Sequence, residues 1–197
     1  MAASADLALL DALAALDRTL RRLAAPAMII GGIAVIARGV PRQTVDIDAT
    51  IWGEAIAIDH LVAELARDGI VPRMVDAGEF ARRHQVLLLR HEPTGTPLEI
   101  SLAWLPFERE ALTRASEVDF GGVAIRVAAV EDLVIYKAVA WRDRDRADIE
   151  RLLVRHGTGI DLARVRGVIG EFASALDDPD RLDEFDALVQ RSSGAIE

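Results

Sequence analysis

Two aspartates separated by one residue, Asp46 and Asp48, have the types and spacing that metal and phosphate chemistry requires. They lie in Thr44–Trp52, where apolar and polar residues alternate as in a β-strand with one buried face. Because side chains alternate across a strand, both carboxylates would project from one face, about 6.5–7 Å apart. A divalent cation would relieve the repulsion between two like charges. Hard oxygen ligands at this spacing suit Mg²⁺ or Mn²⁺, usually completed by substrate phosphates.

The alternative is that the aspartates belong to the solvated face of an edge strand, and an upstream glycine pair argues against it. Gly31 and Gly32 end a short apolar run, which predicts a buried strand that meets a tight turn. Such glycines let backbone amides approach a phosphate closely, and the start of the following helix adds a positive dipole end. Arg42 and Thr44 precede the aspartates and could bind phosphate or order a metal ligand. The glycines could also serve only to make the turn.

Together these residues resemble a known signature. The run Ile30-Gly31-Gly32-Ile33-Ala34, followed by Arg42-Gln43-Thr44-Val45-Asp46-Ile47-Asp48, is similar to the Gly-Gly…Arg-x-Thr/Ser-x-Asp-x-Asp signature of nucleotidyltransferases of the DNA polymerase β superfamily. The subgroup it most resembles contains the AbiEii-type toxins of type IV toxin–antitoxin systems and their uncharacterised relatives. The resemblance covers most of residues 28–153. It implies an α+β fold, in which a mixed β-sheet flanked by helices is followed by a helical C-terminal part.

The family uses a third carboxylate on a neighbouring strand, and the resemblance assigns that place to Glu99. The residue lies in Pro97–Leu102, between apolar neighbours that would face the core. The family usually has aspartate here, and the extra methylene of glutamate shifts the carboxylate by roughly a bond length. From the residues alone, an ordinary exposed glutamate is an equal alternative.

The resemblance continues into the second half of the chain. Glu131–Ala138 and Arg142–Leu152 are similar to the family's Asp-Leu-x-x-x-Lys…Arg-Asp-x-x-Asp-Ile segment. By that likeness Lys137, the only lysine of the chain, would contact the nucleotide phosphates, and Asp148 would help hold the site. From the residues alone, Lys137 could instead snorkel from an apolar helix. Asp148 could equally pair with Arg144 on its own helix.

Hydrophobic spacing and chain breakers predict the elements that must position these residues. Predicted helices cover Leu7–Ala24, Ile33–Arg38, Ala55–Asp68 and Phe107–Ala115. Predicted strands cover Ala27–Ile30, Thr44–Trp52, Val71–Val75, Val86–Leu89 and Leu98–Leu102, with a hairpin over Val118–Val127. From Val130 onward the pattern is almost wholly helical. The sequence thus predicts a nucleotidyltransferase α/β part over residues 1–128 and a helical part over residues 129–197.

The composition limits the classes of function. The absence of cysteine excludes disulfides and sulfur-based zinc sites. No apolar stretch approaches the roughly 20 residues that cross a bilayer, and the N-terminus lacks the basic start of a secretory signal. We therefore expect a cytoplasmic protein without a membrane partner. The net charge of −9 argues against a protein that coats nucleic acid, although Arg142, Arg144 and Arg146 could form a local basic cleft for a nucleic-acid end.

The resemblance implies transfer of a nucleoside monophosphate from a nucleoside triphosphate to an acceptor. Asp46, Asp48 and Glu99 would be catalytic and would hold Mg²⁺ or Mn²⁺, and the phosphates would be bound by Gly31, Gly32, Arg42, Thr44, Lys137 and Asp148. The implied acceptor is a tRNA 3′ end, a protein hydroxyl or a small molecule such as an aminoglycoside. For a toxin, an antitoxin protein would be a partner. A non-catalytic module that binds a nucleotide or a partner with the same fold is the alternative, which the glutamate at position 99 keeps open.

Overall fold

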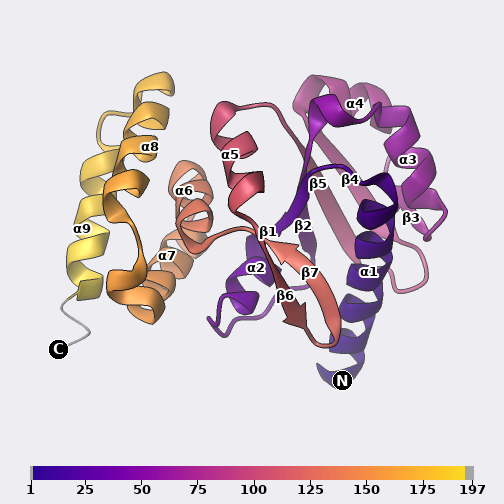
Figure 1. Cartoon of the computed structure of the whole chain (residues 1–197), viewed down its shortest axis with the longest axis horizontal. Helices are drawn as coiled ribbons and strands as arrows, with labels where there is room; N and C mark the ends of the chain where they lie inside the picture. Colours follow the sequence, from indigo (N-terminus) through magenta and orange to yellow (C-terminus); the bar gives the residue numbers. More distant parts are fainter. Residues whose placement is uncertain (1, 194–197) are drawn as a thin grey trace. The chain divides into compact units, whose positions relative to one another are not determined.

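The computed structural model describes residues 2–193, which divide into two compact units (Figure 1). The first unit takes in the chain up to Ala37 together with Arg42–Ala128. The second consists of Arg38–Pro41 and the chain from Ala129 onward. The first unit carries every strand of the described chain, and the second is built from helices, so the predicted α+β fold is confirmed.

A seven-stranded mixed sheet forms the centre of the first unit over the described residues. Its order is β3-β4-β5-β2-β1-β7-β6. The pairs β2–β5 and β1–β7 are parallel, and the other neighbours are antiparallel. The strands are β1 (Ala27–Ile30), β2 (Ile47–Trp52), β3 (Ile70–Pro72), β4 (Val86–His91), β5 (Pro97–Ala103), β6 (Ser116–Phe120) and β7 (Val123–Val127).

The helices of this unit pack around the sheet (Figure 1). They are α1 (Ala2–Leu23), α2 (Gly31–Ala37), α3 (Ile58–Ala66), α4 (Ala77–His84) and α5 (Pro106–Arg114), with a single 3₁₀ turn at Gly53–Ala55. In α1, Leu13 and Leu16 are fully buried, and further leucines of the same helix are partly buried: Leu9, Leu10, Leu20 and Leu23. Near its C-terminal end, the buried Thr19 donates a hydrogen bond to Asp68, which ties α1 to the residues that follow α3.

Strand β2 occupies the middle of the sheet and is shorter than the alternation predicts. It begins at Ile47 rather than Thr44, and Val45, expected in the core, is 76% exposed. The reason is that both neighbours of β2 end here: Asp48 is paired with the last residue of β1, and Ile47 with the start of β5. Residues before Ile47 have no strand to pair with, so the pleat does not extend to Asp46.

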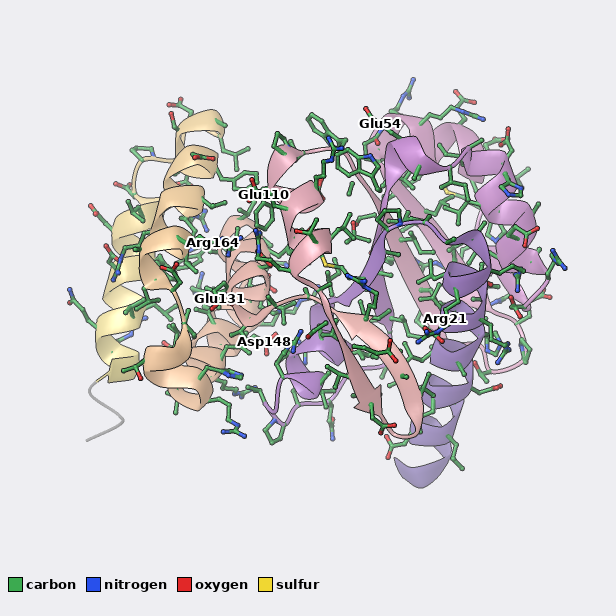
Figure 2. The ribbon with its side chains drawn as sticks, viewed as in Figure 1. Arg21, Glu54, Glu110, Glu131, Asp148 and Arg164 are labelled. Carbon is green, nitrogen blue, oxygen red and sulfur yellow. The ribbon has the colours of Figure 1, made fainter. Side chains whose placement is uncertain are left out.

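Four helices make up the described part of the second unit, with a 3₁₀ turn at Gly157–Gly159. They are α6 (Val130–Ala140), α7 (Asp143–His156), α8 (Leu162–Ala175) and α9 (Arg181–Ser193). The fully buried Asp132 of α6 accepts a hydrogen bond of 2.6 Å from Arg164 of α8, and Figure 2 labels the arginine. None of the described helices is long and apolar enough to cross a membrane.

Candidate functional site

Asp48 lies directly against the glycine turn. Ile30, the last residue of β1, is the antiparallel partner of Asp48, so Gly31 follows beside the same carboxylate. A Cβ added to Gly31 would lie 1.9 Å from Asp48 Oδ2, far inside van der Waals contact. Gly31 also has a φ of +62°, the left-handed region that disfavours every residue with a Cβ. Only glycine at position 31 therefore permits this placement of Asp48.

The second glycine receives the segment that carries the other aspartate. A Cβ on Gly32 would lie 2.4 Å from Thr44 Oγ1, so the threonine hydroxyl packs directly against the backbone of Gly32. The same hydroxyl donates a hydrogen bond of 2.7 Å to Asp46 Oδ1. Asp46 precedes β2, so its carboxylate is oriented by Thr44 and not by the pleat of the strand. Five residues thus share one place, which we call the glycine–aspartate site: Gly31, Gly32, Thr44, Asp46 and Asp48.

Arg42 borders the glycine–aspartate site. Its Cζ would lie 3.3 Å from a Cβ on Gly32, and its Nε donates to the carbonyl of Gln43. Both aspartates of the site are half-buried, as is Arg42. A guanidinium at the border of this glycine turn offers planar donors to a phosphate.

Glu99 is the neighbour of Asp48 on the adjoining strand. The two residues are in register in the parallel β2–β5 pair, so their side chains leave the sheet on the same side. Glu99 is 48% exposed, and its Oε1 accepts a hydrogen bond of 3.1 Å from Arg73 Nη2. Arg73, which follows β3, was missed in the sequence because no local pattern links it to a residue two strands away.

Replacing Gly31 by alanine is expected to lower about a hundredfold any activity that depends on the Asp48 carboxylate, because a misplacement of about 1 Å at a reacting group can cost that much. The added Cβ must push Asp48 away, since the two cannot overlap at 1.9 Å. The matched control is Gly95→Ala, where φ is +74° and no heavy atom lies within 4 Å of the new Cβ. Both variants should lose similar stability in thermal unfolding through backbone strain. Equal activity of the two would contradict the predicted contact.

Lys137, on α6 in the helical unit, is held between two aspartates of α7. Its Nζ donates to Asp148 Oδ2 at 2.7 Å and lies 3.4 Å from Asp145 Oδ1. The lysine side chain is 7% exposed and both carboxylates are 3% exposed, so the ammonium does not snorkel to solvent. Figure 2 marks Asp148. The compact ammonium of a lysine reaches both buried carboxylates, whereas an arginine would present a wider planar group.

Asp145 also accepts hydrogen bonds from the residue that precedes α7. The sequence suggests that Asp145 is the N-cap of a helix from Arg146, whereas α7 begins at Asp143. Asp145 instead accepts from the backbone N–H of Arg142 at 3.2 Å and from Arg142 Nε at 2.6 Å. Burial alone would raise the pKa of Asp145, but the hydrogen bonds from Arg142 and the charge of Lys137 outweigh it, so the pKa lies below its usual value.

This lowered pKa predicts a loss of stability in acid. A carboxyl whose pKa is lower in the folded than in the unfolded protein stabilises the fold above about pH 4, and the contribution disappears as pH falls through the folded pKa. We expect the free energy of unfolding of the wild type to exceed that of Asp145→Asn near neutral pH, with the difference shrinking toward about pH 3. Urea titrations of both proteins across this pH range measure the difference in the free energy of unfolding. A difference that does not change with pH would show that Asp145 does not carry the effect.

The donor set of the glycine–aspartate site fits a hard divalent cation. Among residues 2–193, no three His, Cys, Asp or Glu side chains are grouped closely enough to hold a metal ion by themselves. Mg²⁺ seldom uses such an all-protein cage, and takes one or two carboxylates together with water and substrate phosphates. Asp46 and Asp48 supply two such carboxylates beside a turn that exposes backbone amides.

Comparison with protein families gives one match over most of the chain. The profile of the family described as "Nucleotidyltransferase of unknown function (DUF6036)" matches residues 6–188. This span includes every residue of the glycine–aspartate site, and also Lys137 with its partners Asp145 and Asp148. Among curated protein sequences, no relative matches the chain.

Solved structures of similar fold are nucleotidyltransferases. The antibiotic-resistance factor ANT(2″)-Ia in solution has a TM-score of 0.58 and 21% identity, over 94% of this chain and 100% of that one. A crystal structure of ANT(2″)-Ia in complex with adenylyl-2″-tobramycin has a TM-score of 0.53 and 22% identity, over 87% of this chain and 98% of that one. An antigenic nucleotidyltransferase-like protein from Paracoccidioides brasiliensis has a TM-score of 0.51 and 17% identity, over 90% of this chain and 92% of that one. At these identities the likeness establishes the fold. Membership of the AbiEii-type subgroup stays a prediction.

Proposed function

The chain belongs to the family of nucleotidyltransferases of unknown function (DUF6036), and on that premise we propose that its glycine–aspartate site moves a nucleoside monophosphate from a nucleoside triphosphate to an acceptor hydroxyl. One observation carries the proposal. Asp48 lies against Gly31 while Thr44, which orients Asp46, lies against Gly32. Two carboxylates and side-chain-free backbone therefore border the same space, as binding of a metal-complexed phosphate requires.

The residues of the site divide the chemistry between them. Gly31, Gly32, Arg42 and Thr44 bind the phosphates through backbone amides, a guanidinium and a hydroxyl. The acceptor oxygen attacks the α-phosphorus, and the bond to the pyrophosphate leaving group breaks. The acceptor's proton passes to the Glu99 carboxylate. Since Arg73 bonds Oε1 of that carboxylate, Oε2 is the oxygen that takes the proton.

Asp46 and Asp48 would hold Mg²⁺, or Mn²⁺, together with phosphate oxygens of the nucleotide, and Glu99 lies one strand away as a further ligand. The bound ion supplies charge neutralisation at the phosphates. Thr44 positions Asp46 for this task through its hydrogen bond of 2.7 Å. For Lys137 and Asp148 we propose first a structural role between α6 and α7, while a contact of Lys137 with the phosphates, which the resemblance implies, stays a prediction.

A small hydroxylated molecule is the acceptor class that we favour. The structure of ANT(2″)-Ia contains adenylyl-2″-tobramycin, a nucleotidylated aminoglycoside. The net charge of −9 of the present chain also suits a cationic small molecule better than a polyanionic RNA. A tRNA 3′ end and a protein hydroxyl are the other acceptors, and a toxin whose partner is an antitoxin protein is a further role. If the protein is a toxin, its expression arrests growth and Asp48→Asn relieves the arrest.

Label transfer tests the proposal directly. The purified protein is incubated with each α-labelled nucleoside triphosphate, Mg²⁺ and separate pools of aminoglycosides, tRNA and protein. We expect label on the aminoglycoside pool with the wild type, and none with Asp48→Asn or after chelation of the metal. Label on tRNA or protein instead would keep the enzyme and replace the acceptor. No transfer and no Mg²⁺-dependent nucleotide binding in calorimetry would refute the proposed function.

One observation favours a non-catalytic relative of the same fold. Glu99 stands where the family usually has aspartate, and it is paired with Arg73 at 3.1 Å. In such a module the nucleotide would bind at the glycine–aspartate site without reacting. Nucleotide binding in calorimetry without label transfer, unchanged in Glu99→Gln, would identify it.

A further inference from the structure

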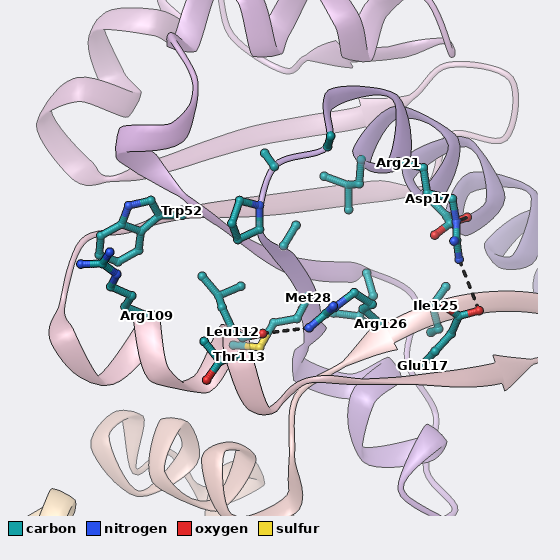
Figure 3. Close-up of a pocket in the computed structure, with 16 residues that line it drawn as sticks. Asp17, Arg21, Met28, Trp52, Arg109, Leu112, Thr113, Glu117, Ile125 and Arg126 are labelled. Carbon is teal, nitrogen blue, oxygen red and sulfur yellow. Dashed lines mark hydrogen bonds and ion pairs between the residues drawn. The ribbon is translucent and has the colours of Figure 1, made fainter.

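A cavity of about 640 Å³ lies in the first unit, at the end of the β1–β2 pair that is remote from the carboxylates. Asp48 is paired with Ile30 at one end of β1, whereas Trp52 donates its N–H to the carbonyl of Pro26 at the other end. Ala27, Met28 and Ile29 of β1 line the cavity, whereas no residue of the glycine–aspartate site does. Its walls come from α1, β1, α5 and β7, with Trp52 of β2 and Glu117 of β6 (Figure 3). Small-molecule sites commonly have volumes of about 300–1,000 Å³.

The wall of the cavity is largely apolar. Leu20, Met28, Leu112 and Ile125 line it, and Met28 and Ile125 are each only 1% exposed. The indole of Trp52, half-buried at the end of β2, adds a flat aromatic surface. A ligand that enters this cavity must bring an apolar body, because polar groups would lose water without gaining partners.

The three arginines that line the cavity differ in their partners. The positive charge of Arg21 is neutralised by two carboxylates, because it pairs with Asp17 at 2.7 Å and with Glu117 at 3.7 Å. Arg109 lies over the Trp52 ring, with its Cζ 5.5 Å from the ring centroid. Arg126 donates from Nη2 to the carbonyls of Leu112 and Ala115.

Within the described chain, Arg109 and Arg126 form no ion pair with any carboxylate. The two carboxylates that line the cavity, Asp17 and Glu117, are already committed to Arg21. The three arginines and two carboxylates of the lining carry a net charge of +1. Glu117 stands opposite Arg126 in the β6–β7 register, which leaves Arg109 as the unmatched charge of the lining. Charge complementarity then calls for an anionic group on the ligand.

We infer that this cavity binds a planar, apolar molecule that carries one anionic group, with its ring beside Trp52 and its anion at Arg109. The site is separate from the one proposed for nucleotide transfer, and its test does not depend on that activity. A guanidinium already stacked on an indole is preorganised for such a ligand, because the flat surface and the cation are presented together.

Two fluorescent probes that differ in a single group test the inference. Anilinonaphthalene sulfonate is planar, apolar and anionic, and N-phenylnaphthylamine has the same ring system without the sulfonate. We expect the sulfonate to bind one to one and about tenfold more tightly than the uncharged amine, because a charge-assisted contact contributes about 1.4 kcal/mol or more. Arg109→Ala should remove most of this preference and leave the affinity for the amine nearly unchanged.

Controls separate this site from other binding. Arg114→Ala removes an arginine from the same helix that does not line the cavity, and it should change neither affinity. Ala25→Trp fills the cavity and should abolish binding of both probes. Near-UV circular dichroism and thermal unfolding establish that each variant is folded. Equal affinity for the two probes, identical effects of Arg109→Ala and Arg114→Ala, or displacement of the sulfonate by nucleotide and Mg²⁺ would overturn the inference.

Discussion

Asp48→Asn is expected to lower nucleotide transfer about a thousandfold or more, because it removes the charge of a metal-binding carboxylate and with it several kcal/mol of transition-state stabilisation. The variant should remain folded. Asp48 and Glu99 are neighbours of like charge on adjoining strands, so loss of one charge relieves the repulsion between them and offsets the interactions that the change removes. Label transfer and calorimetric unfolding measure the two effects.

Asp59→Asn is the matched control for this prediction. Asp59 lies on α3 in the same unit, is 81% exposed and pairs with Arg82 on the surface. The same change of charge at position 59 should leave transfer unchanged and alter stability by about 1 kcal/mol at most. Wild-type transfer by Asp48→Asn would remove Asp48 from the chemistry, whatever the acceptor proves to be.

The second large effect is expected on stability. Lys137→Met removes the ammonium from between two carboxylates that are each 3% exposed, which should destabilise the protein by about 3–5 kcal/mol. Arg144→Met on α7 is the control, since it removes an equal charge from an exposed position. The double variant Lys137→Met/Asp148→Asn should recover part of the loss, because the uncompensated carboxylate is removed with its partner. Urea unfolding of the four proteins measures these terms. Equal stability of Lys137→Met and Arg144→Met would contradict the structural role.

The same variant separates a structural from a substrate-binding role. Assayed well below its unfolding midpoint, Lys137→Met should keep the KM for the nucleoside triphosphate if Lys137 only joins α6 to α7. A KM raised tenfold or more, about 1.4 kcal/mol, in a folded protein would mean that the ammonium also contacts the phosphates. That outcome would support the role implied by the family resemblance.

Local patterns in the sequence were sufficient for much of the first unit. Alternation and breakers predicted β1 and most of β2, and the leucine spacing predicted α1, because these patterns follow from burial of one face of an element. Helix α4 was not predicted, since its only buried residues are the alanines Ala77 and Ala81, which make no apolar stripe. The start of β2 was predicted three residues early, because alternation does not reveal where the neighbouring strands end.

The sequence by itself determined the candidate residues of the site: a glycine pair, a threonine and two aspartates with distinctive types and spacing. Only the tertiary structure decided which of them touch. The contact of Gly31 with Asp48 depends on the β1–β2 register, and the place of Glu99 beside Asp48 depends on the β2–β5 register. The partner of Glu99 likewise comes from an element distant along the chain, and the packing of α6 on α7 decides the partners of Lys137. The cavity beside Trp52 is lined by residues of six elements. Register and packing arise from burial summed over the whole sheet, so no local pattern encodes them.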